Sequence, residues 1–86
     1  MRHFTSPSFW QAYGKLPSNL RNPANSCFGK LKQNPRYPSL HLKRTVPYWS
    51  IRIGRKHRAL GAEVDLGVLW FWIGTHDEYE QMIKQP

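Results

Sequence analysis

The fold is decided by residues 48–74, which read YWSIRIGRKHRALGAEVDLGVLWFWIG. At its start, Trp49, Ile51 and Ile53 alternate with more polar neighbours, which is the two-residue period of a strand with one buried face. Turn-forming residues follow at Gly54-Arg55-Lys56 and at Asp65-Leu66-Gly67. The pattern therefore predicts a meander of three antiparallel strands, at about 48–53, at 57–64 and at 68–74.

The last predicted strand, VLWFWIG at 68–74, is apolar on both faces. Such a strand is typical of the centre of a sheet, where both faces are covered or a ligand covers part of one. Upstream, Leu40 and Leu42 alternate with His41 and Lys43, which predicts a further strand there. Four more residues, Arg2 to Thr5, are expected to form a short first strand.

Two helices are predicted before the meander. Ser6-Pro7 is typical of a helix start, with the serine as the cap and the proline at the first helical position. Phe9, Tyr13 and Leu16 then recur at the spacing of one helical face. The same spacing of apolar residues predicts a second helix over 18–32.

A short C-terminal helix is predicted from Asp77 to Lys84, with Thr75 or Asp77 as its cap. Together these elements predict one α+β domain over residues 1–86. Its two N-terminal helices are expected to pack on one face of an antiparallel meander, and the short helix follows the last strand. The opposite face of the sheet is expected to be open or concave.

The charge distribution favours a polyanionic partner. The chain carries 13 Lys and Arg residues against five Asp and Glu residues, which gives a formal charge of +8. Residues 1–62 contain twelve of these cations and no acid, so their field attracts polyanions and speeds association with them. A basic protein without any nucleic-acid role is the alternative interpretation.

Other classes of protein are disfavoured. No run reaches the roughly 18 apolar residues of a membrane span, and MRHFTSPSFW lacks the apolar segment of a signal peptide. Cys27 is the only cysteine and cannot form an intrachain disulfide. We therefore expect a cytoplasmic protein. Phosphate-binding glycine loops, the serine-hydrolase elbow and zinc-ligand spacing are absent from the sequence.

Strand alternation predicts which side chains share the open face. If the apolar residues pack under the helices, then His41, Lys43, Ser50 and Arg52 point the other way. Further cations and possible proton carriers are expected near this surface: Arg55, Lys56, His57, Arg58, His76 and Tyr79.

Such a set suits RNA cleavage without a metal. The ribose 2′-OH must lose a proton and the leaving 5′-oxygen must gain one, and imidazole transfers protons near neutral pH. Arginine stabilises the extra negative charge of the phosphorane. Plainer interpretations remain: the histidines are ordinary surface groups, Arg52 and Arg58 are solvated or paired with Glu63, and Trp70 and Trp72 belong to the core rather than stacking on bases.

Four segments resemble the RelE/ParE family of bacterial toxins: SPSFWQAYGKLP, NPRYPSLHLKR, YWSIRIGRKHRALG and VLWFWIGTHDEYEQMI. The resemblance covers nearly the whole chain and is strongest at WSIRI, HRALG and WFWIGTHDEYE. It implies the toxin of a type II toxin–antitoxin pair, whose ribosome-dependent members cleave mRNA in the ribosomal A site. The implied partners are an antitoxin, the ribosome and mRNA; neither a membrane, a cofactor nor a metal is expected.

The resemblance also implies roles for individual residues. Arg58 matches a strand arginine that contributes to cleavage in the family, and His76 and Tyr79 are candidates for the group at the end of the last strand. Some relatives have a carboxylate base where this chain has His41, so His41 or His76 is expected to remove the proton. The residues expected to bind phosphate are Lys43, Arg44, Arg52, Arg55, Lys56 and His57.

Two alternatives stay open. One is a ParE-like inhibitor of DNA gyrase without catalysis, against which His76 and Tyr79 argue, because ParE-like proteins lack that pair. The other is an inactive member that only binds an antitoxin or RNA. In each toxin interpretation the antitoxin is expected to offer an acidic, amphipathic segment that lies against the helices.

Overall fold

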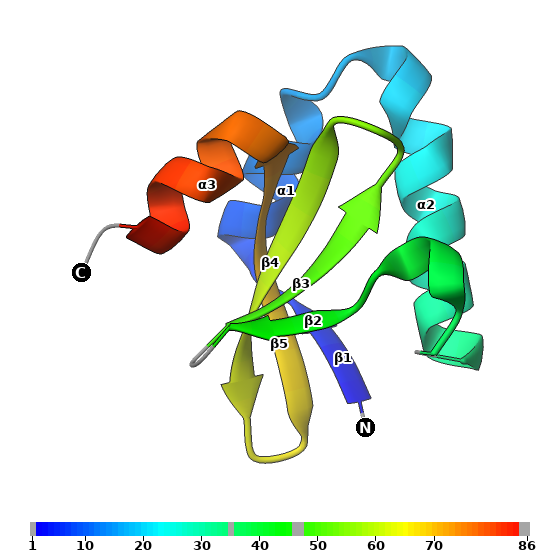
Figure 1. The fold of residues 1–86 in the computed structure, drawn as a ribbon, viewed down its shortest axis with the longest axis vertical. Helices are drawn as coiled ribbons and strands as arrows, with labels where there is room; N and C mark the ends of the chain where they lie inside the picture. Colours follow the sequence, from blue (N-terminus) through cyan, green and yellow to red (C-terminus); the bar gives the residue numbers. More distant parts are fainter. Residues whose placement is uncertain (1, 35, 46–47, 85–86) are drawn as a thin grey trace.

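A computed structural model of the chain describes residues 2–34, 36–45 and 48–84. It contains five strands, three α-helices and one 3₁₀ turn (Figure 1). In chain order these are β1 (Arg2–Thr5), α1 (Pro7–Gly14), α2 (Ser18–Gln33), the 3₁₀ turn η1 (Pro38–Leu40), β2 (Lys43–Thr45), β3 (Tyr48–Ile53), β4 (His57–Val64), β5 (Gly67–Thr75) and α3 (His76–Lys84).

The strands follow the order β1-β5-β4-β3-β2 across a single sheet. Strands β2 to β5 form an antiparallel meander, and β1 adds to the edge of β5 in parallel. The predicted α+β class is confirmed, although the sheet is mixed rather than wholly antiparallel. None of the described helices is long and apolar enough to cross a membrane.

The main core lies between the sheet and the two N-terminal helices (Figure 1). Phe9 of α1, Leu31 of α2, Ile51 and Ile53 of β3 and Trp70 of β5 are almost completely buried there. Burial of side chains of this size stabilises a fold by roughly 1.5–3 kcal/mol each. Ser6 caps α1 as predicted, because its Oγ accepts a hydrogen bond from the Phe9 backbone N–H.

A bulge at Phe71 shifts the register of β5 against β4. Leu60 of β4 pairs with Trp72, whereas Gly61 pairs with Trp70, so Phe71 is an extra residue in β5. The insertion reverses the alternation of side chains from that point on. Gly61 is required beside the bulge, because a Cβ there would overlap the Trp70 ring, which lies in the core.

Helix α3 begins with a reciprocal cap. Thr75 Oγ1 accepts a hydrogen bond from the Glu78 N–H at 3.1 Å, and Glu78 Oε1 accepts one from the Thr75 N–H at 3.0 Å. This arrangement satisfies backbone donors that the first helical turn leaves free. Of the two predicted caps, Thr75 is therefore the one used. Tyr79 of α3 is buried against the sheet, so the face expected to be open is partly covered.

The strand predicted through Leu40 and Leu42 is wrong over its first residues. Pro38 begins a 3₁₀ turn, and His41 follows it with a left-handed φ of 45°. Pairing with β3 starts only at Lys43, opposite Ser50. Leu40 is fully buried even so, because the turn, and not a strand, directs its side chain into the core.

Candidate functional site

Ser50, Arg52 and Arg58 share the face of the sheet that turns away from α1 and α2. Arg52 of β3 lies opposite Arg58 of β4, and Lys43 of β2 lies opposite Ser50. Side chains of directly paired residues point to the same side of a sheet. Ile51, between Ser50 and Arg52, points into the core instead. The register therefore brings three of the predicted cations to one face.

Arg58 is the one charged side chain that is buried among the described residues, with 8% of it exposed. Its Nη2 donates hydrogen bonds to Ser50 Oγ at 2.9 Å and to the His41 carbonyl oxygen at 3.2 Å. Its Nε is buried and has no hydrogen-bond partner in the described part of the chain. Burial lowers the pKa of Arg58 from its usual value, but an arginine remains protonated in proteins.

An acidic partner for Arg58 is not found among residues 2–34, 36–45 and 48–84. Glu63, the partner suggested by the sequence, forms its ion pair with Arg44 at 3.0 Å. The guanidinium of Arg58 instead lies over the ring of Tyr79, 5.1 Å from the ring centroid. Hydroxyl, carbonyl and aromatic groups offset only part of the cost of burying a charge. The guanidinium is therefore held in place but not neutralised.

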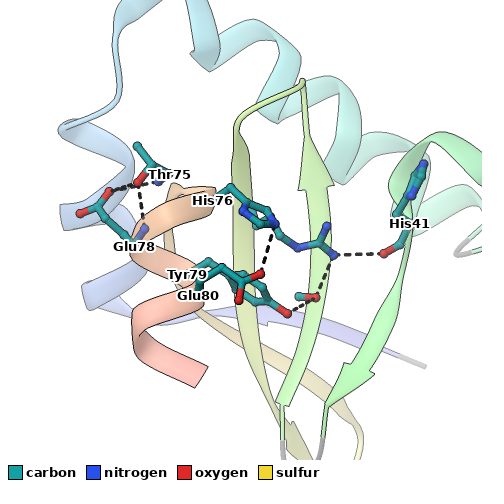
Figure 2. Close-up of polar contacts among 8 residues, drawn as sticks. His41, Thr75, His76, Glu78, Tyr79 and Glu80 are labelled. Atoms are coloured by element: carbon teal, nitrogen blue, oxygen red, sulfur yellow. Dashed lines mark hydrogen bonds and ion pairs between the residues drawn. The ribbon is translucent and has the colours of Figure 1, made fainter. Parts of the chain in front are cut away.

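Tyr79 links Arg58 to a histidine at the start of α3 (Figure 2). The Tyr79 hydroxyl lies 3.4 Å from Ser50 Oγ, and its ring centroid is 5.8 Å from that of His76. His76 Nε2 in turn lies 3.5 Å from Glu80 Oε1, one helical turn further on. His76 is exposed. The contacts therefore form one cluster, with the buried guanidinium of Arg58 at one end and the exposed imidazole of His76 at the other. Its members are Ser50, Arg58, His76, Tyr79 and Glu80.

No family model matches the sequence, and no curated protein matches it. Solved structures do match. This chain superposes on the RelB–RelE antitoxin–toxin complex from Methanococcus jannaschii with a TM-score of 0.71 at 11% identity, over 92% of this chain and 96% of that one. The YoeB/ParE toxin from Agrobacterium tumefaciens gives 0.65 at 18% identity, over 88% and 99% of the two chains.

The isolated Escherichia coli RelE toxin gives a TM-score of 0.61 at 16% identity, over 95% of this chain and 94% of that one. This chain has the RelE fold. The fold implied by the sequence resemblance is therefore confirmed. Identities of this size establish a shared fold and leave the chemistry to be argued from the side chains.

Within the RelE fold of this chain, His41 reaches Arg58 through its backbone. The left-handed conformation of His41 presents its carbonyl oxygen to the guanidinium, and Figure 2 shows the imidazole directed away from that oxygen. His41 also lines a groove with Lys30 and Arg52. The structure thus places the His41 backbone, and not the proton carrier expected from the sequence, at Arg58.

The remaining predicted cations lie in three different places. Arg52 donates from Nε to the Gly54 carbonyl oxygen at 2.8 Å. Arg44 pairs with Glu63 beside Trp49, on the opposite face of the sheet from Ser50. A groove at the end of the sheet, next to the start of α3, is lined by Arg55, Lys56, His57, Thr75, His76 and Asp77.

Two members of the cluster were missed by the sequence analysis as site residues. Ser50 stands out only as a small polar residue on the face of Arg52, and its contact with Arg58 requires the strand register. Glu80 could have been found from its spacing, because residues four apart face each other on a helix. Among the described ranges, no group of three His, Cys, Asp or Glu side chains is placed to hold a metal ion.

Proposed function

We propose that this chain is the toxin of a type II toxin–antitoxin pair and that it is a ribosome-dependent mRNA endonuclease that uses no metal. The observation that supports this most is Arg58, a buried guanidinium that has no carboxylate partner among the described residues. A phosphodiester would supply the missing negative charge. Arginine suits that task because its planar fork of N–H groups matches two phosphate oxygens.

The neighbours of Arg58 suit cleavage through the ribose 2′-OH. In the proposed reaction the 2′-oxygen attacks the adjacent phosphorus, the bond to the 5′-oxygen breaks, and a 2′,3′-cyclic phosphate and a 5′-hydroxyl result. His76, oriented by Glu80, takes the 2′-OH proton, and the Tyr79 hydroxyl donates a proton to the leaving oxygen. Arg58 stabilises the phosphorane. The Tyr79 ring lies over the guanidinium, so it must shift when the phosphate binds.

The partners of the proposed toxin follow from its charge and its structural neighbours. The chain is strongly basic, and residues 1–62 contain no acid, which favours mRNA on the ribosome as the target and an acidic antitoxin as the inhibitor. The neighbours include a RelB–RelE complex from Methanococcus jannaschii and a YoeB–YefM complex from Staphylococcus aureus. A cytoplasmic location accords with these partners.

The test is expression from a tightly repressed promoter, followed by mapping of mRNA 5′ ends. The wild-type chain should arrest growth and cut translated messages at a fixed codon position. Arg58→Ala and His76→Ala should abolish both effects yet still bind the antitoxin. Arg44→Ala is the matched control, because it removes a cation of the same kind from the other face of the sheet, and it should remain toxic.

Two outcomes would contradict the nuclease proposal. Growth arrest with intact mRNA and an induced DNA-damage response would identify a gyrase inhibitor. Harmless expression of the wild-type chain would identify a protein that only binds an antitoxin or RNA. That second candidate is favoured by one observation, the cover that Tyr79 gives to Arg58.

A further inference from the structure

A second polar pocket lies beside the start of α3, separate from the Arg58 cluster. It is a cavity of about 300 Å³ between α1, the last residues of β5 and the first turn of α3. Figure 2 shows Glu78, which lines it, on the side of α3 turned away from Tyr79 and Glu80. The side chains that give the pocket its chemistry are Gln11, Lys15, His57, Trp72, Thr75 and Glu78.

The pocket exists because β1 is short. β1 pairs with β5 only from Gly67 to Trp70, and α1 lies beside the rest of β5. Ser8 of α1 fixes this arrangement, because its Oγ donates a hydrogen bond to the Phe71 carbonyl oxygen at 2.8 Å. Side chains from both faces of the sheet can therefore reach the uncovered edge at Trp72 to Thr75.

Gly74 brings an aromatic ring and a carboxylate together in this pocket. A Cβ at Gly74 would overlap the Trp72 indole at Cζ2 and would lie 3.1 Å from Glu78 Oε1. The absence of a side chain thus lets Trp72 lie flat across the backbone, next to Glu78. Trp72 is only partly buried, unlike Trp70, which lies in the core.

Glu78 is fixed by its cap and keeps one oxygen free for a ligand. Its Oε1 accepts hydrogen bonds from the Thr75 N–H and hydroxyl at 3.0 and 2.9 Å, whereas its Oε2 has no partner among the described residues. The backbone and side-chain hydrogen bonds from Thr75 lower the pKa of Glu78, and the charges of His57 and Lys15 lower it further. At neutral pH this carboxylate is ionised and can only accept hydrogen bonds.

We propose that this pocket binds a nucleobase, with guanine preferred, against the Trp72 indole and with its Watson–Crick edge on Glu78. Guanine has two adjacent donors on that edge, N1–H and the N2 amino group, and the two lone pairs of the free Oε2 can accept from both. Adenine has only one donor there, beside an acceptor that a carboxylate repels, and uracil has a single N–H between two carbonyls. Aromatic contact with the base is tolerant of sequence, so Glu78 sets the preference.

Lys15 supplies positive charge for a nucleotide phosphate, and the His57 imidazole lines the same pocket. His57 and Thr75 also line the groove of Arg55, Lys56, His76 and Asp77, so the pocket adjoins a cationic surface that runs to His76. The assignment of the base to an RNA substrate rests on the proposed nuclease function. Binding of a mononucleotide does not, and it can be tested separately.

The four tryptophan indole N–H groups provide a direct measurement by NMR. The indoles of Trp10, Trp49 and Trp70 donate hydrogen bonds to Thr5, Glu63 and His3, and they serve as internal references. Titration of the full chain with GMP should shift the Trp72 indole resonance, assigned from its loss in Trp72→Phe, with the largest change of the four. AMP and UMP should bind about tenfold more weakly, the effect of losing one hydrogen bond to a charged group.

Glu78→Gln is the decisive variant, because glutamine keeps the helix cap but replaces the anionic acceptor by an amide. It should weaken GMP binding about tenfold and remove the preference over AMP. Glu63→Gln, the same change at the Arg44 ion pair, should leave GMP binding unaltered. Thermal unfolding of both variants shows that each is folded under the conditions of the titration.

The results separate this proposal from the nuclease proposal. Arg58→Ala should abolish mRNA cleavage and retain the GMP-dependent shift of Trp72. If inorganic phosphate moves the Trp72 resonance as far as GMP does, the pocket is an anion site and the proposal is wrong. Two further results would overturn it: equal binding of GMP, AMP and UMP, or a Trp72 resonance that no nucleotide moves at millimolar concentration. Neither result would contradict the nuclease proposal.

Discussion

Arg58 differs from the other cations because it is the one charged side chain that is buried among the described residues. Removing such an ion from water costs several kcal/mol, and two acceptors and one aromatic face offset part of that cost. Proteins that retain a buried, unneutralised charge commonly use it. The local contacts therefore serve to orient the guanidinium, and the acceptor that orients it most closely is the Ser50 hydroxyl at 2.9 Å.

Removal of the Ser50 hydroxyl should destabilise the chain through Arg58. Ser50→Ala leaves Nη2 with one acceptor, and a hydrogen bond to a charged group contributes about 1.5–3 kcal/mol. We expect a loss of that size in the free energy of unfolding, measured by urea denaturation. Ser8→Ala is the matched control: it removes only neutral, exposed hydrogen bonds, to the Phe71 carbonyl and to Ser6 Oγ, and should cost about 1 kcal/mol.

A double-mutant cycle identifies the partner of Ser50. In an Arg58→Met background the buried charge is gone, so Ser50→Ala should cost at least 1 kcal/mol less there (about the value of one such bond). If the two substitutions are additive, Ser50 does not act on Arg58. Under the proposed nuclease function, Ser50→Ala in the wild-type background should also reduce mRNA cleavage, because a misplaced guanidinium stabilises the transition state less well.

At the scale of elements, the sequence predicted the helices and strands whose signals lie within a few neighbouring residues. The bounds 57–64 of β4 follow from two flanking turns, and α1 follows from Ser6-Pro7. The bulge at Phe71 could not be predicted, because an inserted apolar residue is invisible within an apolar run. The turn before His41 was missed for a related reason: two leucines two residues apart fit a strand, and only the backbone conformation at Pro38 to His41 excludes one.

Strand alternation could predict only which side chains of the candidate site share a face of the sheet. Alternation placed Ser50 and Arg52 on the face away from the helices, and the register adds Arg58 to them. It could not show that Tyr79 of α3 lies over Arg58, because the packing of a helix against a sheet depends on tertiary contacts. For the same reason Arg44 was expected at the phosphate, whereas it pairs with Glu63 on the other face.

Pro23 destabilises α2, and a single substitution can remove this effect. It is the sixth residue of the helix and is exposed. Because proline has no backbone N–H, it cannot donate the hydrogen bond that an interior helical position normally makes. Alanine is about 3 kcal/mol more favourable than proline inside a helix, and this difference already includes the greater freedom of the unfolded alanine chain. Pro23→Ala should therefore stabilise the chain by about 3 kcal/mol, which raises Tm by roughly 15 °C in a domain of this size.

Pro7→Ala provides the control for that measurement. Pro7 occupies the first position of α1, where the N–H has no helical acceptor and the fixed φ of proline favours the helix. Its replacement should leave Tm unchanged or lower it slightly. An unchanged Tm in Pro23→Ala, measured by calorimetry, would show that α2 already accommodates the proline without loss.

For the whole molecule, the position of each charge matters more for binding nucleic acid than the total charge of +8 does. The five acids belong to the end of β4, the turn after it and α3. Asp77 therefore lies in the groove of Arg55 and Lys56, whereas Lys43 and Arg52 lie on the face of Ser50. Cations that contact phosphates release counterions from the nucleic acid, and those elsewhere contribute only a screened, long-range field.

Two variants that each remove one positive charge distinguish these effects. Lys43 is exposed on the face of Ser50, so Lys43→Ala should weaken binding to a short single-stranded RNA and reduce the slope of log K against log salt by about 1. Arg44→Ala lowers the net charge equally but removes a cation that is already paired on the other face, so its slope should equal that of the wild type. Fluorescence anisotropy across a salt series, without ribosomes, gives both slopes. Equal reductions in the two variants would mean that RNA responds only to net charge, and the face of Ser50, Arg52 and Arg58 would then have no special place in binding.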